Sequence, residues 1–178
     1  MGAAWVFIRP TATTLQVPPA THMVAAGNLG GPFTPAEFQY QLSATAGINY
    51  SISGLPDWLT ATPTSGTVPA TVTFTVNDNA TRLAVGTYGP ITITFTNTST
   101  GEGTQTRTAT LTVGAPSLQV TPTSNIAASG TQGGPFSPLF FSYTLSSTSG
   151  SVNYSISGVP DWLTISPNPG TANSGERW

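Results

Sequence analysis

Apolar and polar residues alternate along several short stretches of the chain, and each stretch predicts a β-strand with one buried face. The clearest are FQYQL at 38–42, NYSIS at 49–53, TVTFTV at 71–76, ITITFTN at 91–97 and TRTATLTV at 106–113. Thr fills most outward positions, and Thr suits strands better than helices. No window of about ten or more residues has helical apolar spacing. The pattern therefore predicts an all-β, antiparallel fold with one solvated face on each sheet.

The chain repeats itself after about 100 residues. Residues 15–47 align with 118–150, and NYSISGLPDWLT at 49–60 differs from NYSISGVPDWLT at 153–164 only in Leu55 against Val159. Solenoid units have roughly 20–50 residues, whereas an immunoglobulin-like sandwich has about 100. We therefore expect a tandem repeat of immunoglobulin-like β-sandwiches. The expected division is an irregular segment at 1–13, a sandwich at 14–113, a linker at 114–117 and a second copy at 118–178.

The second copy is expected to be incomplete. After Gly170 and Thr171 the chain reads ANSGERW, so residues 72–113 have no counterpart. Those residues supply the last three strands of the first copy, and a sandwich without them leaves its inner face and strand edges uncovered. We expect residues 118–178 to pack poorly alone, and the chain to be a fragment or to have lost its reading frame near Glu176. Slow amide exchange across 140–165 in the isolated segment would contradict the first expectation.

Composition narrows the possible partners. Only 6% of residues are charged and the net charge is −2, so the chain lacks the basic footprint of nucleic-acid binding. No apolar run reaches the ~18–20 residues of a membrane span, and the N-terminus lacks the basic region of a signal peptide. Cysteine is absent, which excludes disulfides and thiolate metal sites. We expect no nucleic-acid partner and no membrane insertion.

The order of motifs after Gly54 resembles the BACON domain, an all-β immunoglobulin-like module of bacterial and phage proteins. The likeness consists of a Trp-Leu pair, Pro-x-x-Gly, an alternating strand, an Asn, Gly-x-Tyr and another alternating strand. In this chain these are Trp58-Leu59, Pro63 with Gly66, 71–76, Asn77, Gly86 with Tyr88, and 91–96. The resemblance covers nearly all of 15–113 and about half a domain of 118–171. Other bacterial Ig-like surface repeats share the Trp-Leu core, and Pro90, early in the second strand, departs from the pattern.

The resemblance implies a non-catalytic repeat module of a larger secreted or surface protein of a bacterium or phage. Such a module would lie outside the cell or on its surface, next to flanking domains of the same polypeptide. Its implied role is that of a structural spacer or adhesion module. The alternative that the family's neighbours suggest is carbohydrate binding, with mucin or another polysaccharide as the glycan. Fold alone does not decide between these roles.

The repeated segment supplies the candidate carbohydrate-binding residues. They are a tryptophan, the aspartate before it and an upstream tyrosine: Trp58, Asp57 and Tyr50 in the first copy, and Trp162, Asp161 and Tyr154 in the second. An exposed Trp face can stack on a sugar ring, and Asp can accept hydroxyl hydrogen bonds. The structural alternative, which we favour, places the Trp in the sandwich core and uses Pro-Asp as turn chemistry. Exposure of Trp58 discriminates between the two.

Other candidate chemistry is sparse. His22 is the one histidine, and its aligned residue is Asn125, so we interpret it as a polar loop residue. Asn77-Asp78-Asn79 has one carboxylate, too few for a calcium site, and predicts a turn. GGPF at 30–33 and 133–136 predicts a glycine turn with a phenylalanine that plugs the sandwich. No catalytic motif or local carboxylate pair occurs, so we expect no enzyme activity, no catalytic residues, no metal and no cofactor.

Overall fold

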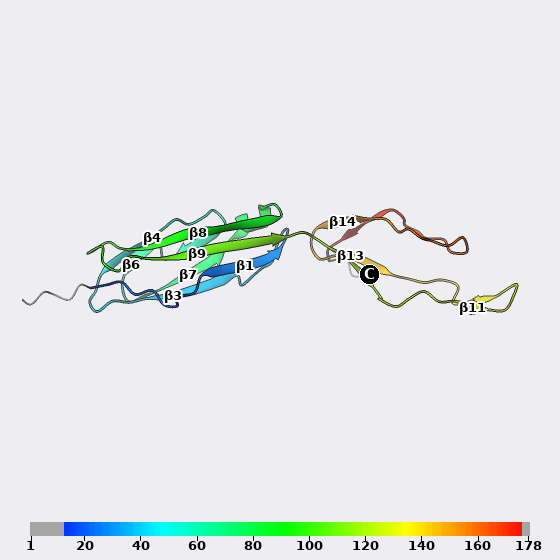
Figure 1. Ribbon diagram of the computed structural model, residues 1–178, viewed down its shortest axis with the longest axis horizontal. Helices are drawn as coiled ribbons and strands as arrows, with labels where there is room; N and C mark the ends of the chain where they lie inside the picture. Colours follow the sequence, from blue (N-terminus) through cyan, green and yellow to red (C-terminus); the bar gives the residue numbers. More distant parts are fainter. Residues whose placement is uncertain (1–12, 176–178) are drawn as a thin grey trace, which may run out of the picture.

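A computed structural model describes residues 13–175 and is all-β, which confirms the predicted fold class. Figure 1 shows two units in succession along the long axis, the first compact and the second opened into two arms. The predicted irregular segment lies outside the described residues except for Thr13, and so does Glu176. In the described range, no helix is long and apolar enough to cross a membrane.

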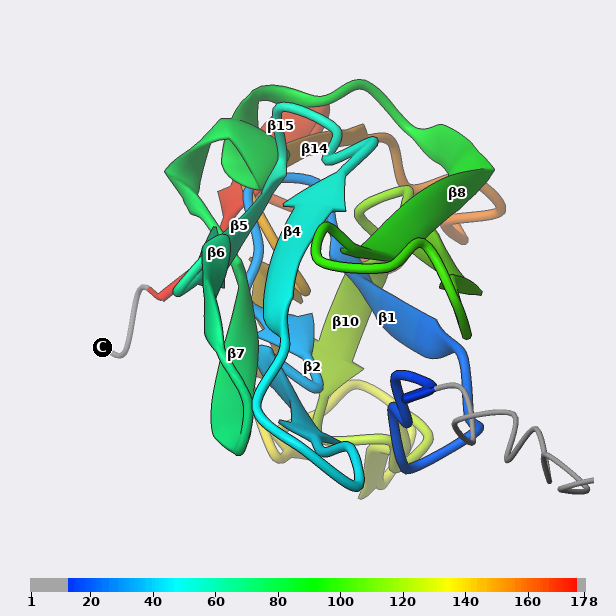
Figure 2. The same ribbon diagram turned by 90° about the vertical axis from the view of Figure 1, so that its left-hand side faces the viewer.

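The first unit is a sandwich of two sheets, with strand orders β2-β1-β9-β8-β4-β6 and β3-β7-β5. Seen end-on, its strands enclose a central core, with β4 between β6 and β8 (Figure 2). A short 3-10 helix, η1 (Asp78–Arg82), follows β7. The strands are β1 (Met23–Asn28), β2 (Phe33–Thr34), β3 (Glu37–Leu42), β4 (Asn49–Ser53), β5 (Leu59–Thr62), β6 (Ser65–Thr67), β7 (Ala70–Val76), β8 (Gly86–Asn97) and β9 (Gln105–Gly114).

The strands predicted by alternation all form, as β3, β4, β7, β8 and β9. Strands β1, β5 and β6 were not predicted, because β1 (MVAAGN) contains small residues and β5 and β6 are short. One pairing departs from the antiparallel expectation, since β1 runs parallel to β9. Strands β1 and β2 thereby join the larger sheet next to its last strand in sequence, β9.

Three aromatic rings from both sheets form the centre of the core. Tyr40 meets Phe74 edge-on at a centroid distance of 5.6 Å. Phe95, on the opposite sheet, lies 5.7 Å from Tyr40 and 5.8 Å from Phe74. All three side chains are fully buried. Because β3, β7 and β8 each contribute one ring, the core requires strands from both the early and the late part of the unit.

The unusual proline of β8 lies in a β-bulge. The register between β8 and β9 shifts between Tyr88, which faces Leu111, and Ile91, which faces Ala109. Gly89 and Pro90 therefore oppose a single residue of β9. A bulge tolerates the missing N–H of proline, which a regular central strand does not.

A buried arginine anchors the first residues of the sandwich. Arg107 lies on the inward face of β9 and is 8% exposed. Its guanidinium donates hydrogen bonds to the backbone oxygens of Val17 and, at 3.1 Å, Pro19, and lies 5.8 Å from the Tyr40 ring centroid. These contacts hold the segment before β1 against the sheet. The alternation at 106–113 did not predict this role.

The second unit contains three separate two-stranded ladders. They repeat first-unit registers: Tyr154 faces Gly170 as Tyr50 faces Gly66. Residues 115–175 contain no counterpart of β7, β8 or β9. The strand that follows β12 begins only at Thr144, later than β3 does in the first unit, because no β7 counterpart is present to pair with residues 141–143. The ladders are β10 (Leu118–Thr121) with β13 (Thr144–Ser147), β11 (Ser129–Gly130) with β12 (Phe136–Ser137), and β14 (Ser151–Tyr154) with β15 (Gly170–Asn173).

Candidate functional site

Trp58, the principal candidate of the first unit, lies at the entrance to β5 and is only 5% exposed. The turn before it is closed by the Leu59 amide, which donates to the Pro56 carbonyl at 3.0 Å. The Trp58 carbonyl accepts from the Asn77 amide at 3.0 Å, and Leu59 is buried. Turn and strand together direct the indole into the core, as the structural interpretation of the repeated segment predicts.

The Asn77-Asp78-Asn79 segment holds this turn in place. The side-chain amides of Asn77 and Asn79 both donate to the Asp57 carbonyl, at 2.9 and 3.1 Å. The Asn77 side-chain oxygen also accepts from the Asn79 backbone amide and caps η1. The Asn77 and Asn79 side chains therefore form hydrogen bonds with the backbone, which makes them unsuited as cation ligands. Between residues 13 and 175 no group of three or more His, Cys, Asp or Glu side chains is close enough to hold a metal ion.

Tyr50, on β4, is 1% exposed and its hydroxyl has no hydrogen-bond partner. Burial raises the pKa of this phenol because the charged phenolate would lose its hydration. Of the three first-unit candidates, only the Asp57 side chain is exposed. The aromatic platform that sugar stacking requires is therefore not formed by Trp58 and Tyr50, because both side chains are buried in the core to which β7 and β8 contribute.

The same segment has a different environment in the second unit. The turn is retained, with the Leu163 amide 3.0 Å from the Pro160 carbonyl, yet Trp162 is 68% exposed. Asp161 is exposed and Tyr154 is half-buried. Residues 115–175 contain no counterpart of Asn77, η1 or β7 to cover this indole. Trp162 and Tyr154 therefore face an open space, whereas Asp161 is exposed outside it.

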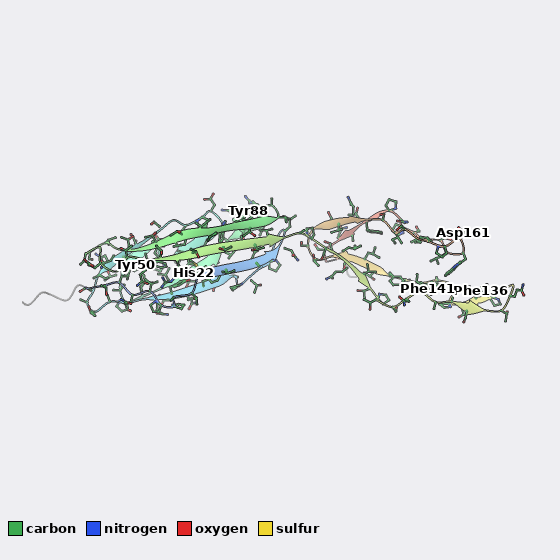
Figure 3. The ribbon with its side chains drawn as sticks, viewed as in Figure 1. His22, Tyr50, Tyr88, Phe136, Phe141 and Asp161 are labelled. Carbon is green, nitrogen blue, oxygen red and sulfur yellow. The ribbon has the colours of Figure 1, made fainter. Side chains whose placement is uncertain are left out.

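That space is a groove of about 910 Å³ between the two arms of the second unit. Figure 3 shows Asp161 on one arm and Phe136 and Phe141 on the other. No charged side chain lines the groove, so its walls offer apolar surface, hydroxyl groups and backbone edges but no general acid or base. Its larger lining side chains include Leu118, Val120, Tyr143, Leu145, Ile156 and Trp162.

Two groove residues were missed by the sequence reasoning. Leu139 and Phe140 are 83% and 80% exposed and line the groove. Their aligned residues are Ala36 and Glu37, which are exposed on the first unit. The exchange of a small and a charged residue for two large apolar ones is visible in the repeat alignment and is the signal that could have found them.

The remaining sequence candidates have structural roles in the first unit. The exposed His22 accepts a hydrogen bond at Nδ1 from the Thr108 amide, at 3.1 Å, and so joins the start of β1 to β9. In the GGPF segment, the Gly31 amide donates to the Asn28 carbonyl at 2.8 Å and Phe33 is buried. The counterpart Phe136 is 52% exposed.

Comparison with known proteins identifies one family. The family model described as the viral BACON domain matches residues 33–133 and 139–177, which is more than half of the chain. The first match includes the Trp58-Leu59 pair and the strands on which the resemblance rests. No curated protein matches the chain.

Proposed function

The chain belongs to the viral BACON domain family, and on this premise we propose that it is a non-catalytic spacer or adhesion module of a larger secreted or surface protein of a bacterium or phage. The observation that carries the proposal is the burial of Trp58 and Tyr50, at 5% and 1% exposure. The most faithfully repeated segment of the chain thus builds core in the complete unit. A segment repeated for packing supports a scaffold role.

The connection between the units also supports a spacer. Strand β9 ends at Gly114 and β10 begins at Leu118, so three residues, Ala115, Pro116 and Ser117, separate them. A short connection that contains proline restricts the angles available to the chain. The exposed positions of β7, β8 and β9 are mainly Thr, which leaves a polar and nearly uncharged surface.

Carbohydrate binding is the second candidate, and Trp162 is the observation that favours it. This indole is 68% exposed and lies beside the exposed Asp161. An exposed indole can stack on a sugar ring, and the neighbouring carboxylate can accept hydrogen bonds from sugar hydroxyls. The same Trp is buried in the first unit, however, so absence of covering strands explains its exposure without a ligand.

Tryptophan fluorescence of the full chain tests spacer against glycan-binding module. Replacement of Trp5 and Trp178 by Phe leaves Trp58 and Trp162 as reporters. We expect acrylamide to quench Trp162 and to spare Trp58, and neither to respond to mucin-type or plant-type glycans. Trp58→Phe and Trp162→Phe in this background separate the two signals. A saturable response to one glycan class that disappears in Trp162→Phe would replace the spacer proposal by the binding one.

The surface location is a separate part of the proposal. An antibody raised against residues 13–114 should label intact cells or particles that produce the full-length protein. Labelling that requires lysis would contradict a surface module, whatever the outcome of the glycan measurement.

A further inference from the structure

The first and last strands of the larger sheet lie side by side in the first unit and run in the same direction. Strands β1 and β9 are paired over six residues of each strand, from Met23 opposite Ala109 to Asn28 opposite Gly114. Figure 1 shows both arrows pointing the same way along the long axis of the unit. The chain therefore enters this strand pair at one end of the sandwich and leaves it at the other.

Hydrogen bonds extend this parallel contact to the residues before β1. The Leu15 amide donates to the Glu102 carbonyl at 3.3 Å, and the Gln105 side chain donates to the Leu15 carbonyl at 2.8 Å. Further hydrogen bonds of the same kind join Asn97 to Thr13, Arg107 to Val17 and Pro19, and Thr108 to His22. Every contact advances in the same direction along both segments. Residues 13–28 are therefore fastened to residues 97–114 in one continuous parallel alignment.

Tension applied through the two ends of the unit acts along the axis of this alignment. The hydrogen bonds of a parallel ladder are evenly spaced, so a force along the strands loads all of them together. A force across the strands instead breaks them one after another. Strand β9 is also paired with β8 on its other side, which holds it in the body of the sandwich. Because forced unfolding is governed by the unfolding rate, simultaneous rupture of these contacts should make the unit resistant to stretching.

We propose that the first unit is a mechanical clamp, in which the parallel contact between residues 13–28 and 97–114 resists tension applied between the two ends of the unit. The biological use of the clamp rests on the spacer or adhesion role proposed above, because a module between a surface and an attached partner transmits tension along its chain. The clamp itself is a property of the first unit and involves no residue of 118–178.

Single-molecule force spectroscopy on the full chain tests the clamp by comparing two pulling directions. The sequence contains no cysteine, so handles attach only to introduced thiols. Thr13→Cys with Ala115→Cys pulls along the strands, whereas Thr13→Cys with Glu102→Cys pulls the same starting residue away from its neighbour across the strands. Ala115 and Glu102 are both exposed. The folded contacts are the same in both experiments, and only the direction of the force differs.

At equal loading rate, we expect the rupture force along the strands to be several times the rupture force across them. Equal rupture forces in the two directions would overturn the proposal. The chain length released in each event identifies the unit that unfolds, because it is set by the residues between the two handles. This comparison requires no substitution in the core or in the clamp contacts.

Two variants separate the clamp from the overall stability of the sandwich. Arg107→Met removes the donor that ties Val17 and Pro19 to β9, and should lower the rupture force along the strands. Phe74→Leu weakens the core on β7, which belongs to the smaller sheet and contributes no strand to the clamp. It should lower the urea midpoint but leave the rupture force along the strands unchanged. Equal losses of rupture force in the two variants would assign the resistance to the core as a whole and contradict the clamp.

The outcomes are distinguishable from those of the spacer proposal. Equal rupture forces together with surface labelling would remove the clamp and keep the spacer. A direction-dependent rupture force in a chain that is absent from the surface would keep the clamp and remove the spacer role.

Discussion

In the first unit the tryptophan of the repeated segment is 5% exposed, and in the second unit the same tryptophan is 68% exposed. The turn in front of it has the same 3.0 Å hydrogen bond in both places, from Leu59 to Pro56 and from Leu163 to Pro160. The two nearly identical segments therefore form the same turn, but the tryptophan is buried in one unit and exposed in the other. The difference lies in residues 70–114, which contribute strands to the core around the first segment and have no counterpart among the described residues 163–175.

Side-chain hydrogen bonds between residues close in sequence are the same in both units. The Tyr40 hydroxyl donates to the Thr21 carbonyl at 2.7 Å, and the Tyr143 hydroxyl donates to the Ser124 carbonyl at 2.5 Å. Thr67 donates to the Asn49 side chain at 2.8 Å, and Thr171 donates to Asn153 at the same distance. These pairs lie within 19 residues of each other in sequence. Local interactions are thus repeated, whereas the core that requires distant strands is not.

The largest expected effect comes from removing each tryptophan. Trp58→Ala should lower the free energy of unfolding of the first unit by about 3–5 kcal/mol, because it leaves a cavity in a packed core. Trp162→Ala should change the free energy of unfolding of the chain by less than about 0.5 kcal/mol, since the Trp162 side chain is exposed. Urea unfolding followed by circular dichroism measures both. Equal effects would show that the second tryptophan is buried in solution.

The glycine of the repeated segment gives the next contrast. Gly54 and Gly158 have positive φ values of 83° and 73°, but a Cβ on Gly54 would collide with the Thr92 carbonyl of β8, whereas Gly158 has open space around it. Gly54→Ala should cost about 3 kcal/mol or more, and Gly158→Ala about 1 kcal/mol from its backbone conformation alone. Thermal unfolding of the two variants checks the order. A larger loss for Gly158→Ala would show that strands cover the second segment as well.

Arg107 tests how far β9 stabilises the start of a unit. Arg107→Met should destabilise the first unit by about 2 kcal/mol, because the backbone oxygens of Val17 and Pro19 lose a buried charged donor. Their counterparts Val120 and Pro122 have no such donor, as β9 has no counterpart between residues 115 and 175. Amide exchange should therefore accelerate around residues 15–20 of the variant and approach that of 118–123. Unchanged exchange at 15–20 would contradict this anchoring role.

The two buried tyrosines of the first unit give the smallest effects. Tyr40→Phe should cost about 1 kcal/mol, since its hydroxyl donates to Thr21, whereas Tyr50→Phe should be neutral or stabilise by up to about 1 kcal/mol, since its hydroxyl lacks a partner. Chemical denaturation at neutral pH measures both. A loss for Tyr50→Phe as large as that for Tyr40→Phe would show that the Tyr50 hydroxyl is hydrogen-bonded in solution.

Alkaline pH should act on the same two residues. Burial is the main cause of the raised pKa of Tyr40, with Arg107 acting in the opposite direction, and burial alone raises that of Tyr50. A raised folded-state pKa means that the stability contribution is complete below pH 10, the unperturbed value, and is lost as the pH rises through the folded-state value. The double variant Tyr40→Phe/Tyr50→Phe should lose less stability between pH 9 and pH 11, as followed by unfolding at each pH. Parallel curves for the variant and the parent would exclude these phenols as the cause.

Most strands of the first unit were predictable because Thr alternates with large apolar residues, as in TVTFTV and ITITFTN. Strand β1 was not predictable, because its small residues show little alternation of apolar and polar side chains and its pairing partner β9 is about 85 residues away. The turn preceding each tryptophan was also predictable, from Pro-Asp. The groove was predictable only in part: the repeat alignment shows Leu139 and Phe140 in place of Ala36 and Glu37, whereas their position in the groove required the structure.

The sequence by itself determined the all-β class, the internal repeat and the local turns, because these depend on alternation and on residues near each other in the chain. Only the tertiary structure decided that Trp58 and Tyr50 belong to the core and that Trp162 faces an open groove. Burial depends on which strands share a core with a residue. Strands β7 to β9 follow Trp58 in the chain, whereas the described residues 163–175 contain no counterpart of them. The same twelve-residue segment is therefore core in one unit and surface in the other.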